Sequence, residues 1–414
     1  EEALTRFSEN AISQNVLKSF TEVSVRFIDR GRVVKTSVNP SRDIRKQVHK
    51  ALTLLSLQKK GSHIPPLIKG DYKFQRTSRF FPSTASLSPE FRALEIRKAA
   101  KKCAERKQTC CGIFASGWRS LTVANNVGIR KNYRESFASF EITVTDGKGF
   151  GWAQKTSRNA KDIDYENAFE TASLKAKMAR NPKEIGPGKY TVVLEPAAAA
   201  DILSFIIYYG FGSRNFAEGR SFVSGKLGKK IFARNISIYD DAHAGPSTGM
   251  PFDYEGAQRK RLKLIENGFV REVPMDRKTA PKTGMKSTGH SLPQPHAAGA
   301  VCANATLAPG NSSLAEIIKN TEKGIYVTQF HYTNLLRQIP PEITGMTRNG
   351  TYMIENGKIK YAVKNMRFTE NILNVFNNVD LIGNSLETFF EHGFLLSAPA
   401  LRIRNFNFSS ATKF

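Results

Sequence analysis

Apolar and polar residues alternate near the start of the chain and then recur with helical spacing. Val23, Val25 and Phe27 would share one face of a strand, and an Asp-Arg-Gly turn follows, so the pattern predicts a hairpin over 21–34. The patterns further predict a helix over 43–57, a loop over 61–86 and a second helix that begins at 88–90. Three or four strands are expected between 110 and 157, with a break at Gly117, and a third helix over 164–180.

Residues that break helices and strands cluster between Asn181 and Gly188. Because such a cluster between two periodic segments is typical of a domain boundary, it predicts a linker at 182–188. The linker would separate an N-terminal domain at 1–181 from a C-terminal domain at 189–414.

The second half is expected to be rich in strands. It opens with a predicted strand at 190–195 and a predicted helix at 197–209. Asn-Gly pairs at 267–268 and 356–357 suit tight hairpin turns, in which both central residues have positive φ. The expected fold class is therefore α+β, with an N-terminal α/β sandwich-type domain and a C-terminal, mainly antiparallel, barrel-like β domain.

Composition narrows the class of protein. Hydrophobic residues make up 40% of the 414 residues, which excludes a disordered chain, and four cysteines are too few for a disulfide framework, so a reducing, cytoplasmic location is expected. The longest apolar stretch, 197–211, is too short for a membrane span and contains Asp201. Because the chain starts at Glu1 without an initiator Met, an N-terminal piece is expected to be missing.

The net charge of +26 permits a polyanionic partner. The predicted helix over 90–107 is strongly basic and includes Arg92 and Arg106. Such a surface can bind the phosphate groups of a nucleic acid, because binding releases counterions. It lacks the interleaved aromatic residues of single-strand binders, so a solvated helix face is the preferred interpretation. Nucleic acid is not the expected partner, although a polyanion-binding protein stays an alternative function.

Candidate metal ligands are sparse. His290, His296 and Cys302 form the densest set, and together they could hold a zinc ion in an open catalytic site. That arrangement would make the chain a self-sufficient metallopeptidase. Their spacing matches no helix or hairpin pattern, so a mobile loop is the competing interpretation.

Short strings spread over nearly the whole chain resemble, in order, signatures of the TldD/PmbA family. Members of that family are named as modulators of DNA gyrase and as peptide-maturation proteases. The strings are Arg6–Asn15, Ala217–Gly228, Ile238–Asp241, Pro251–Gly256, Leu264–Gly268, Ser287–His290, Leu307–Gly310, Gly324–Thr328, Gly345–Thr351 and Ile354–Gly357.

The resemblance implies a two-domain protein that forms dimers around a cavity, in which an unfolded peptide is held as an added strand. Catalytic members carry HExxxH on a helix just before the Gly-Arg-Ser-Phe string, and a Cys near the C-terminus completes their zinc site. Histidines four residues apart share one helix face, and the carboxylate between them can activate water.

Carried over to this chain, the HExxxH positions fall on Ser204, Phe205 and Tyr209. No Cys follows Cys302, and residues 387–398 occupy the region of the missing ligand. The chain therefore resembles the non-catalytic PmbA-like (TldE-like) branch. No catalytic residue and no cofactor are expected in this chain, and zinc is expected in a partner, either an HExxxH-bearing TldD-like paralogue or a second copy.

The resemblance also suggests where a peptide would be held, namely on strands and loops around 326–332 and 347–352. Ordinary sheet core is an equally weighted interpretation of the same residues. The candidate peptide-contacting residues are Tyr326, Thr328, His331, Tyr332, Arg348, Asn349 and Tyr352.

Overall fold

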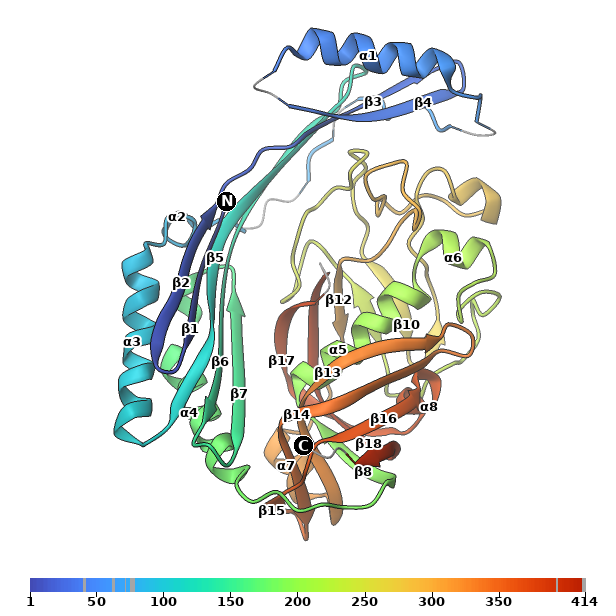
Figure 1. Cartoon of the computed structure of the whole chain (residues 1–414). Helices are drawn as coiled ribbons and strands as arrows, with labels where there is room; N and C mark the ends of the chain where they lie inside the picture. The colour runs from blue at the N-terminus through green and yellow to red at the C-terminus, as the bar shows by residue number, and fades with distance from the viewer. Residues whose placement is uncertain (40–41, 62–63, 71, 75–78, 392–393, 412–414) are drawn as a thin grey trace.

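The computed structural model describes residues 1–39, 42–61, 64–70, 72–74, 79–391 and 394–411. Within them the strands form a five-stranded N-terminal sheet, a two-stranded sheet and an eleven-stranded C-terminal sheet (Figure 1). The mixture of helices and strands confirms the predicted α+β class. The N-terminal sheet has the order β2-β1-β5-β6-β7 and consists of β1 (Glu2–Ser8), β2 (Ala11–Lys18), β5 (Thr109–Ala124), β6 (Arg130–Thr145) and β7 (Phe150–Ser157).

Two helices, α3 (Pro89–Glu105) and α4 (Tyr165–Met178), cover one face of the N-terminal sheet (Figure 1). Helix α3 begins as predicted, because the Ser88 side chain accepts a hydrogen bond from the backbone N of Phe91. The core beneath the helices includes Phe114 and Phe140, which are both fully buried. A short helix, α2 (Pro82–Ala85), and a 3-10 turn, η1 (Ala160–Asp162), complete this layer.

The basic face predicted for α3 is partly wrong. Arg92 is buried, and its Nε donates to Thr5 Oγ1 at 3.0 Å while its Nη1 donates to the Leu87 carbonyl at 2.9 Å. Arg106 pairs with Glu170 of α4 at 2.7 Å. These two cations join α3 to its neighbours, and they are not displayed for a polyanion.

The strand break predicted at Gly117 is absent. Strand β5 runs through this glycine and pairs with β6 along its full length. The glycine is needed because the start of the chain, where it enters β1 and pairs with β5, passes close to it: a Cβ at position 117 would lie 2.3 Å from the backbone O of Glu1.

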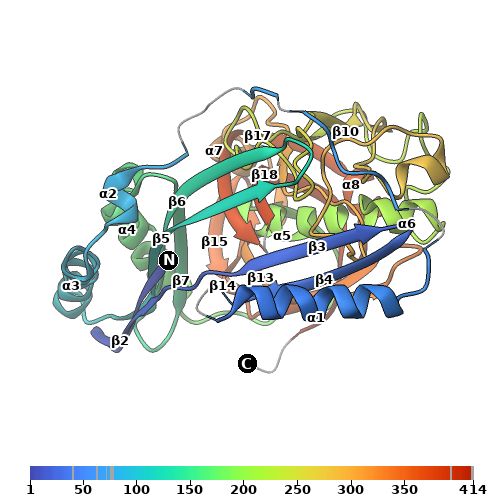
Figure 2. The same cartoon turned by 90° about the horizontal axis from the view of Figure 1, so that it is seen from above.

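The predicted hairpin at 21–34 is confirmed by β3 (Val23–Asp29) and β4 (Arg32–Val38). Helix α1 (Ile44–Leu57) packs on the hairpin, and Figures 1 and 2 show this unit beside the far ends of β5 and β6, above the C-terminal sheet. An ion pair of 3.1 Å between Arg26 of β3 and Glu255 connects the unit to the second half of the chain.

The C-terminal sheet closes on itself. Strands β8, β13, β14, β16 and β18 pair in sequence, and β18 pairs again with β8, which completes a five-strand ring. This ring confirms the barrel-like prediction, although the pairs β8–β13 and β12–β18 are parallel. The strands are β8 (Gly188–Leu194), β9 (Ile238–Asp240), β10 (Leu262–Glu266), β11 (Phe269–Val270), β12 (Asn304–Leu307), β13 (Lys323–Arg337), β14 (Glu342–Glu355), β15 (Lys358–Ala362), β16 (Met366–Asn371), β17 (Val379–Glu391) and β18 (Phe394–Ala411).

Both predicted Asn-Gly turns are confirmed. Asn267 and Gly268 have φ values of 51° and 81°, and Asn356 and Gly357 have values of 50° and 71°. Positive φ at both central residues is the geometry of a type I′ turn, which matches the twist of the strands that it joins.

The buried helix α5 (Pro196–Phe205) packs against β13, β17 and β18. It continues into a π-turn, η2 (Ile206–Gly210), where the sequence predicts regular helix. Among the described residues, no helix combines the length and the apolar character that crossing a membrane requires. The remaining short helices are α6 (Ser213–Ala217), η3 (Ala280–Thr283), α7 (Leu314–Lys319) and α8 (Ile372–Asn377).

Candidate functional site

The three positions that the sequence predicts to correspond to HExxxH lie at the end of α5 and in the π-turn. Ser204 is buried, and its hydroxyl donates to the carbonyl of Asp201 at 2.7 Å. The rings of Phe205 and Tyr209 stack with their centroids 5.9 Å apart and an interplanar angle of 20°. These positions therefore hold a stacked pair of aromatic rings and a serine whose hydroxyl is hydrogen-bonded to a backbone carbonyl.

Further aromatic rings extend this surface. Tyr208 contacts Tyr209 edge-on at 4.9 Å, and on its other side it contacts Phe394 at 6.1 Å. Burial, and then the neighbouring Tyr208, raise the pKa of Tyr209 above its ordinary value. Its hydroxyl is therefore protonated at neutral pH and is a poor ligand for a cation. The rings of Phe205, Tyr208, Tyr209 and Phe394 are called the aromatic cluster below.

Through Phe394, the aromatic cluster includes part of the region expected to replace the C-terminal ligand, residues 387–398. In that region Glu387 of β17 forms an ion pair of 2.6 Å with Lys155 of β7. The ring of Phe390 lies under the guanidinium groups of both Arg119 and Arg158, at 5.9 and 5.7 Å. The end of β17 is therefore held against the N-terminal sheet, so the candidate site borders both halves of the chain.

The structure buries some of the candidate peptide-contacting residues. Tyr326 and Thr328 both donate hydrogen bonds to the Glu195 carboxylate, and the Tyr352 hydroxyl donates to the carbonyl of Lys175 at 2.8 Å. Glu195 also pairs with the Lys175 ammonium at 2.6 Å. Because α4 carries Lys175 and Glu195 directly precedes α5, these side chains form a polar junction between the two halves, as the sheet-core interpretation expects.

Other candidates are exposed. The Tyr332 side chain is 75% exposed, and its φ of 53° is unusual for a bulky residue in a strand. Its ring lies edge-on to His331, whose Nε2 accepts a hydrogen bond from Arg348. Burial, and then the charge of Arg348, lower the pKa of His331. Asn349, also at positive φ, follows Arg348 on β14.

The alternative metal candidates do not assemble as one set. His290 is fully buried between Asp240, at 3.2 Å from Nε2, and Thr288, at 2.9 Å from Nδ1. Burial and then Asp240 raise the pKa of the Cys302 thiol well above its ordinary value, so it is no ready thiolate ligand. His296 is exposed on its loop. Among the described residues, no three His, Cys, Asp or Glu side chains are grouped to hold a metal ion.

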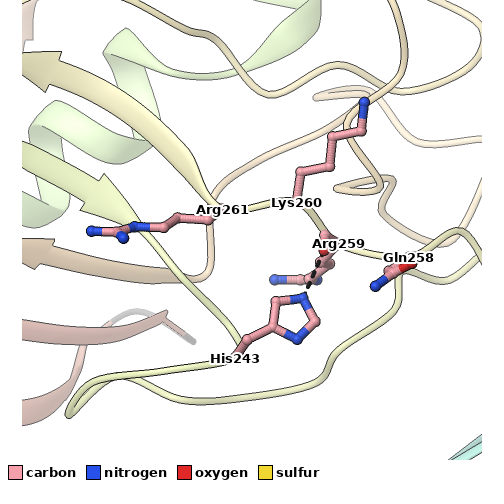
Figure 3. A pocket seen from close by; sticks show the side chains of 5 residues that line it. All are labelled: His243, Gln258, Arg259, Lys260 and Arg261. Carbon is pink, nitrogen blue, oxygen red and sulfur yellow. Dashed lines mark hydrogen bonds between the residues drawn. The ribbon is translucent and has the colours of Figure 1, made fainter. Parts of the chain in front are cut away.

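A pocket of about 460 Å³ lies in the C-terminal half (Figure 3). Its lining contains three cationic side chains and no carboxylate. The lining residues are His243, Gln258, Arg259, Lys260 and Arg261.

Sequence reasoning missed several of these features. The pair of Lys175 and Glu195 crosses the predicted linker, and the sequence contains no signal that joins them. Arg259 was missed because its burial follows from the folding of its loop, and one arginine in a basic chain is not distinctive. The aromatic cluster was indicated only in part, through the resemblance that marked Phe205 and Tyr209.

A family profile described as "PmbA/TldA metallopeptidase C-terminal domain" matches residues 187–410, which is more than half of the chain. The chain is 27% identical over 241 residues to a metalloprotease TldD homologue of Buchnera aphidicola, an alignment that covers 55% of this chain but only 48% of that relative. It is 25% identical over 317 residues to the metalloprotease PmbA of Escherichia coli O157:H7, covering 73% of this chain and 67% of that protein.

The fold is similar to the crystal structure of TldE from Thermococcus kodakarensis. The TM-score is 0.86 at 19% sequence identity, and the superposition covers 98% of this chain and 94% of that chain. At this identity the similarity shows the fold alone. The profile match over more than half of the chain, in line with the ordered signatures, shows that the chain belongs to the TldD/PmbA family.

Proposed function

We propose that this chain is the non-catalytic subunit of a zinc metallopeptidase pair and that it holds an unfolded peptide while an HExxxH-bearing TldD-like relative cuts it. The observation that supports the proposal is the aromatic cluster. Where catalytic relatives place two imidazoles and a carboxylate, this chain has an engaged serine and a stacked pair of aromatic rings.

The residues at these positions do not fit zinc. A zinc site needs imidazole, thiolate or carboxylate ligands, and activation of water needs a base. The Ser204 hydroxyl donates to a backbone carbonyl, Phe205 has only carbon in its side chain, and the raised pKa of Tyr209 keeps that hydroxyl protonated. No catalytic step is therefore assigned to this chain.

The same region is suited to holding an extended chain. Strand β13 pairs in parallel with β8 only through Ile325–Val327, and beyond Val327 that edge has no strand partner among the described residues. An extended peptide can bind such an edge through backbone hydrogen bonds. Exposed Tyr332 and Arg348 lie along this part of β13 and β14 and would contact the peptide's side chains.

Tyr332→Ala is expected to weaken the binding of a fluorescein-labelled unstructured peptide by about tenfold, because a large exposed aromatic surface is lost. Fluorescence anisotropy measures the affinity, and electrophoresis of the same samples shows whether the peptide stays intact. The wild-type chain alone should bind the peptide without cutting it.

Leu94→Ala is the matched control. Leu94 is 47% exposed on α3, which covers the face of the N-terminal sheet that is turned away from the C-terminal half (Figure 1). Truncation of Leu94 should therefore leave peptide affinity unchanged. Peptide cleavage by the purified chain, or equal losses of affinity in both variants, would contradict the proposed role.

A further inference from the structure

The π-turn η2 presents one ring of the aromatic cluster to solvent. Tyr208 is 47% exposed, whereas Phe205 and Phe394 are each only 7% exposed. The ring of Tyr208 meets the rings of Tyr209 and Phe394 at steep interplanar angles of 82° and 63°. Because this half-exposed ring is backed by buried rings, a further apolar group that covers it removes apolar surface from water on both sides of the contact.

The π-turn that carries Tyr208 is fixed from behind. The Ser221 hydroxyl donates a hydrogen bond to the Gly210 carbonyl at 2.6 Å, at the end of the turn. The ring of Phe222 packs so closely on Gly210 that a Cβ there would lie 2.6 Å from it. Turns of this kind are rare and frequently occur at functional sites. Tyr208 is therefore presented by an ordered backbone, which lowers the entropic cost of binding.

The aromatic cluster is continuous with the part of β13 that is proposed to hold the peptide. Helix α5 packs against β13 (Figure 1), and the Thr333 hydroxyl of β13 donates a hydrogen bond to the Asp201 carboxylate of α5. Phe205 lies one helical turn after Asp201, and its ring stacks on that of Tyr209. Thr333 directly follows Tyr332, where the register between β13 and β14 shifts. Irregularities of this kind are common beside binding sites.

The spacing suits one extended peptide. Tyr208 comes seven residues after Asp201, which corresponds to about 10 Å of helix at about 1.5 Å per residue. An extended chain advances about 3.3 Å per residue, so about three of its residues span this distance. A peptide whose backbone lies along β13 can therefore place one side chain at Tyr208.

We propose that Tyr208 and the rings behind it form a subsite for an aromatic side chain of the held peptide, and this inference rests on the proposed peptide-holding function. An aromatic side chain gains an edge-to-face or offset contact with Tyr208 that an aliphatic side chain of similar size does not make. A cationic side chain can also lie over an aromatic ring, but the net charge of +26 disfavours a cationic peptide. The subsite would thus select Phe, Tyr or Trp over Leu or Lys.

Three matched peptides test this selectivity. They are unstructured and fluorescein-labelled, and they differ only in carrying Phe, Leu or Lys at one central position. In fluorescence anisotropy with the wild-type chain, the Phe peptide should bind about fivefold more tightly than the Leu peptide. Binding of the Leu or Lys peptide as tight as that of the Phe peptide, or tighter, would overturn the aromatic subsite while peptide holding stands. Absence of binding to any of the three would overturn both proposals.

Two substitutions of Tyr208 separate the ring from the hydroxyl and from mere bulk. Tyr208→Leu keeps an apolar side chain but loses the ring, so it should bind the Phe and Leu peptides with equal affinity. Tyr208→Phe keeps the ring and should retain the preference of about fivefold, as should Leu94→Ala on α3. A preference that survives in Tyr208→Leu, or one that is lost in Tyr208→Phe, would overturn the assignment to the ring.

Discussion

Replacing Glu195 with alanine is expected to lower the free energy of unfolding by about 3–5 kcal/mol, since breaking a buried ion pair leaves the partner charge uncompensated. The Lys175 ammonium would lose its carboxylate at 2.6 Å, and the Tyr326 hydroxyl would lose its acceptor. Both side chains of the pair are nearly buried, at 11% and 13% exposure, so water can replace little of what is lost. Urea unfolding followed by circular dichroism measures the change.

Glu218→Ala is the matched control for this variant. Glu218 also pairs with cations, Arg214 and Arg220, but its side chain is 41% exposed. Surface pairs of this kind contribute about 0–1 kcal/mol. Equal effects of Glu195→Ala and Glu218→Ala on the free energy of unfolding would contradict this prediction, because the polar junction would then stabilise the fold no more than a surface ion pair does.

His290→Ala is expected to destabilise the fold by about 2–4 kcal/mol without changing metal content. The buried imidazole bridges Asp240 and Thr288, so its removal leaves a cavity and takes a hydrogen bond from a fully buried carboxylate. His296→Ala should stay within about 0.5 kcal/mol of the wild type, because that side chain is exposed. Thermal or urea unfolding of both variants tests the difference.

The paired histidine variants also separate a structural role from a catalytic one. A zinc site shared by His290 and His296 would make both substitutions reduce bound metal together. The geometry instead predicts a large stability loss for one variant and almost none for the other, with metal content unaffected in both.

The sequence was most informative where the signal is local. The Ser88 cap of α3 and the two Asn-Gly turns depend on a few adjacent residues, and each is found where expected. The strand break predicted at Gly117 was wrong because this glycine leaves room for the start of the chain, more than a hundred residues earlier, to lie beside β5. Closure of the barrel by β18 and β8 is likewise a long-range pairing that periodicity cannot reveal.

The candidate site could be predicted only in part. The resemblance predicts Ser204, Phe205 and Tyr209 as the motif positions, but the contact between Tyr208 and Phe394 depends on how β18 folds back. The sequence could not decide between sheet core and peptide contact for Tyr326 and Tyr352, which are buried, because alternating residues on a strand look alike whether the face meets a peptide or another part of the chain. The division into domains at 1–181 and 189–414 stays a prediction.

The zinc content of the purified chain, never exposed to a chelator, tests the central claim most directly. Elemental analysis should find a zinc-to-chain ratio near zero, since the positions predicted to correspond to the family's ligands hold a hydrogen-bonded hydroxyl and stacked rings. A ratio near one, retained after extensive dialysis, would contradict the non-catalytic role.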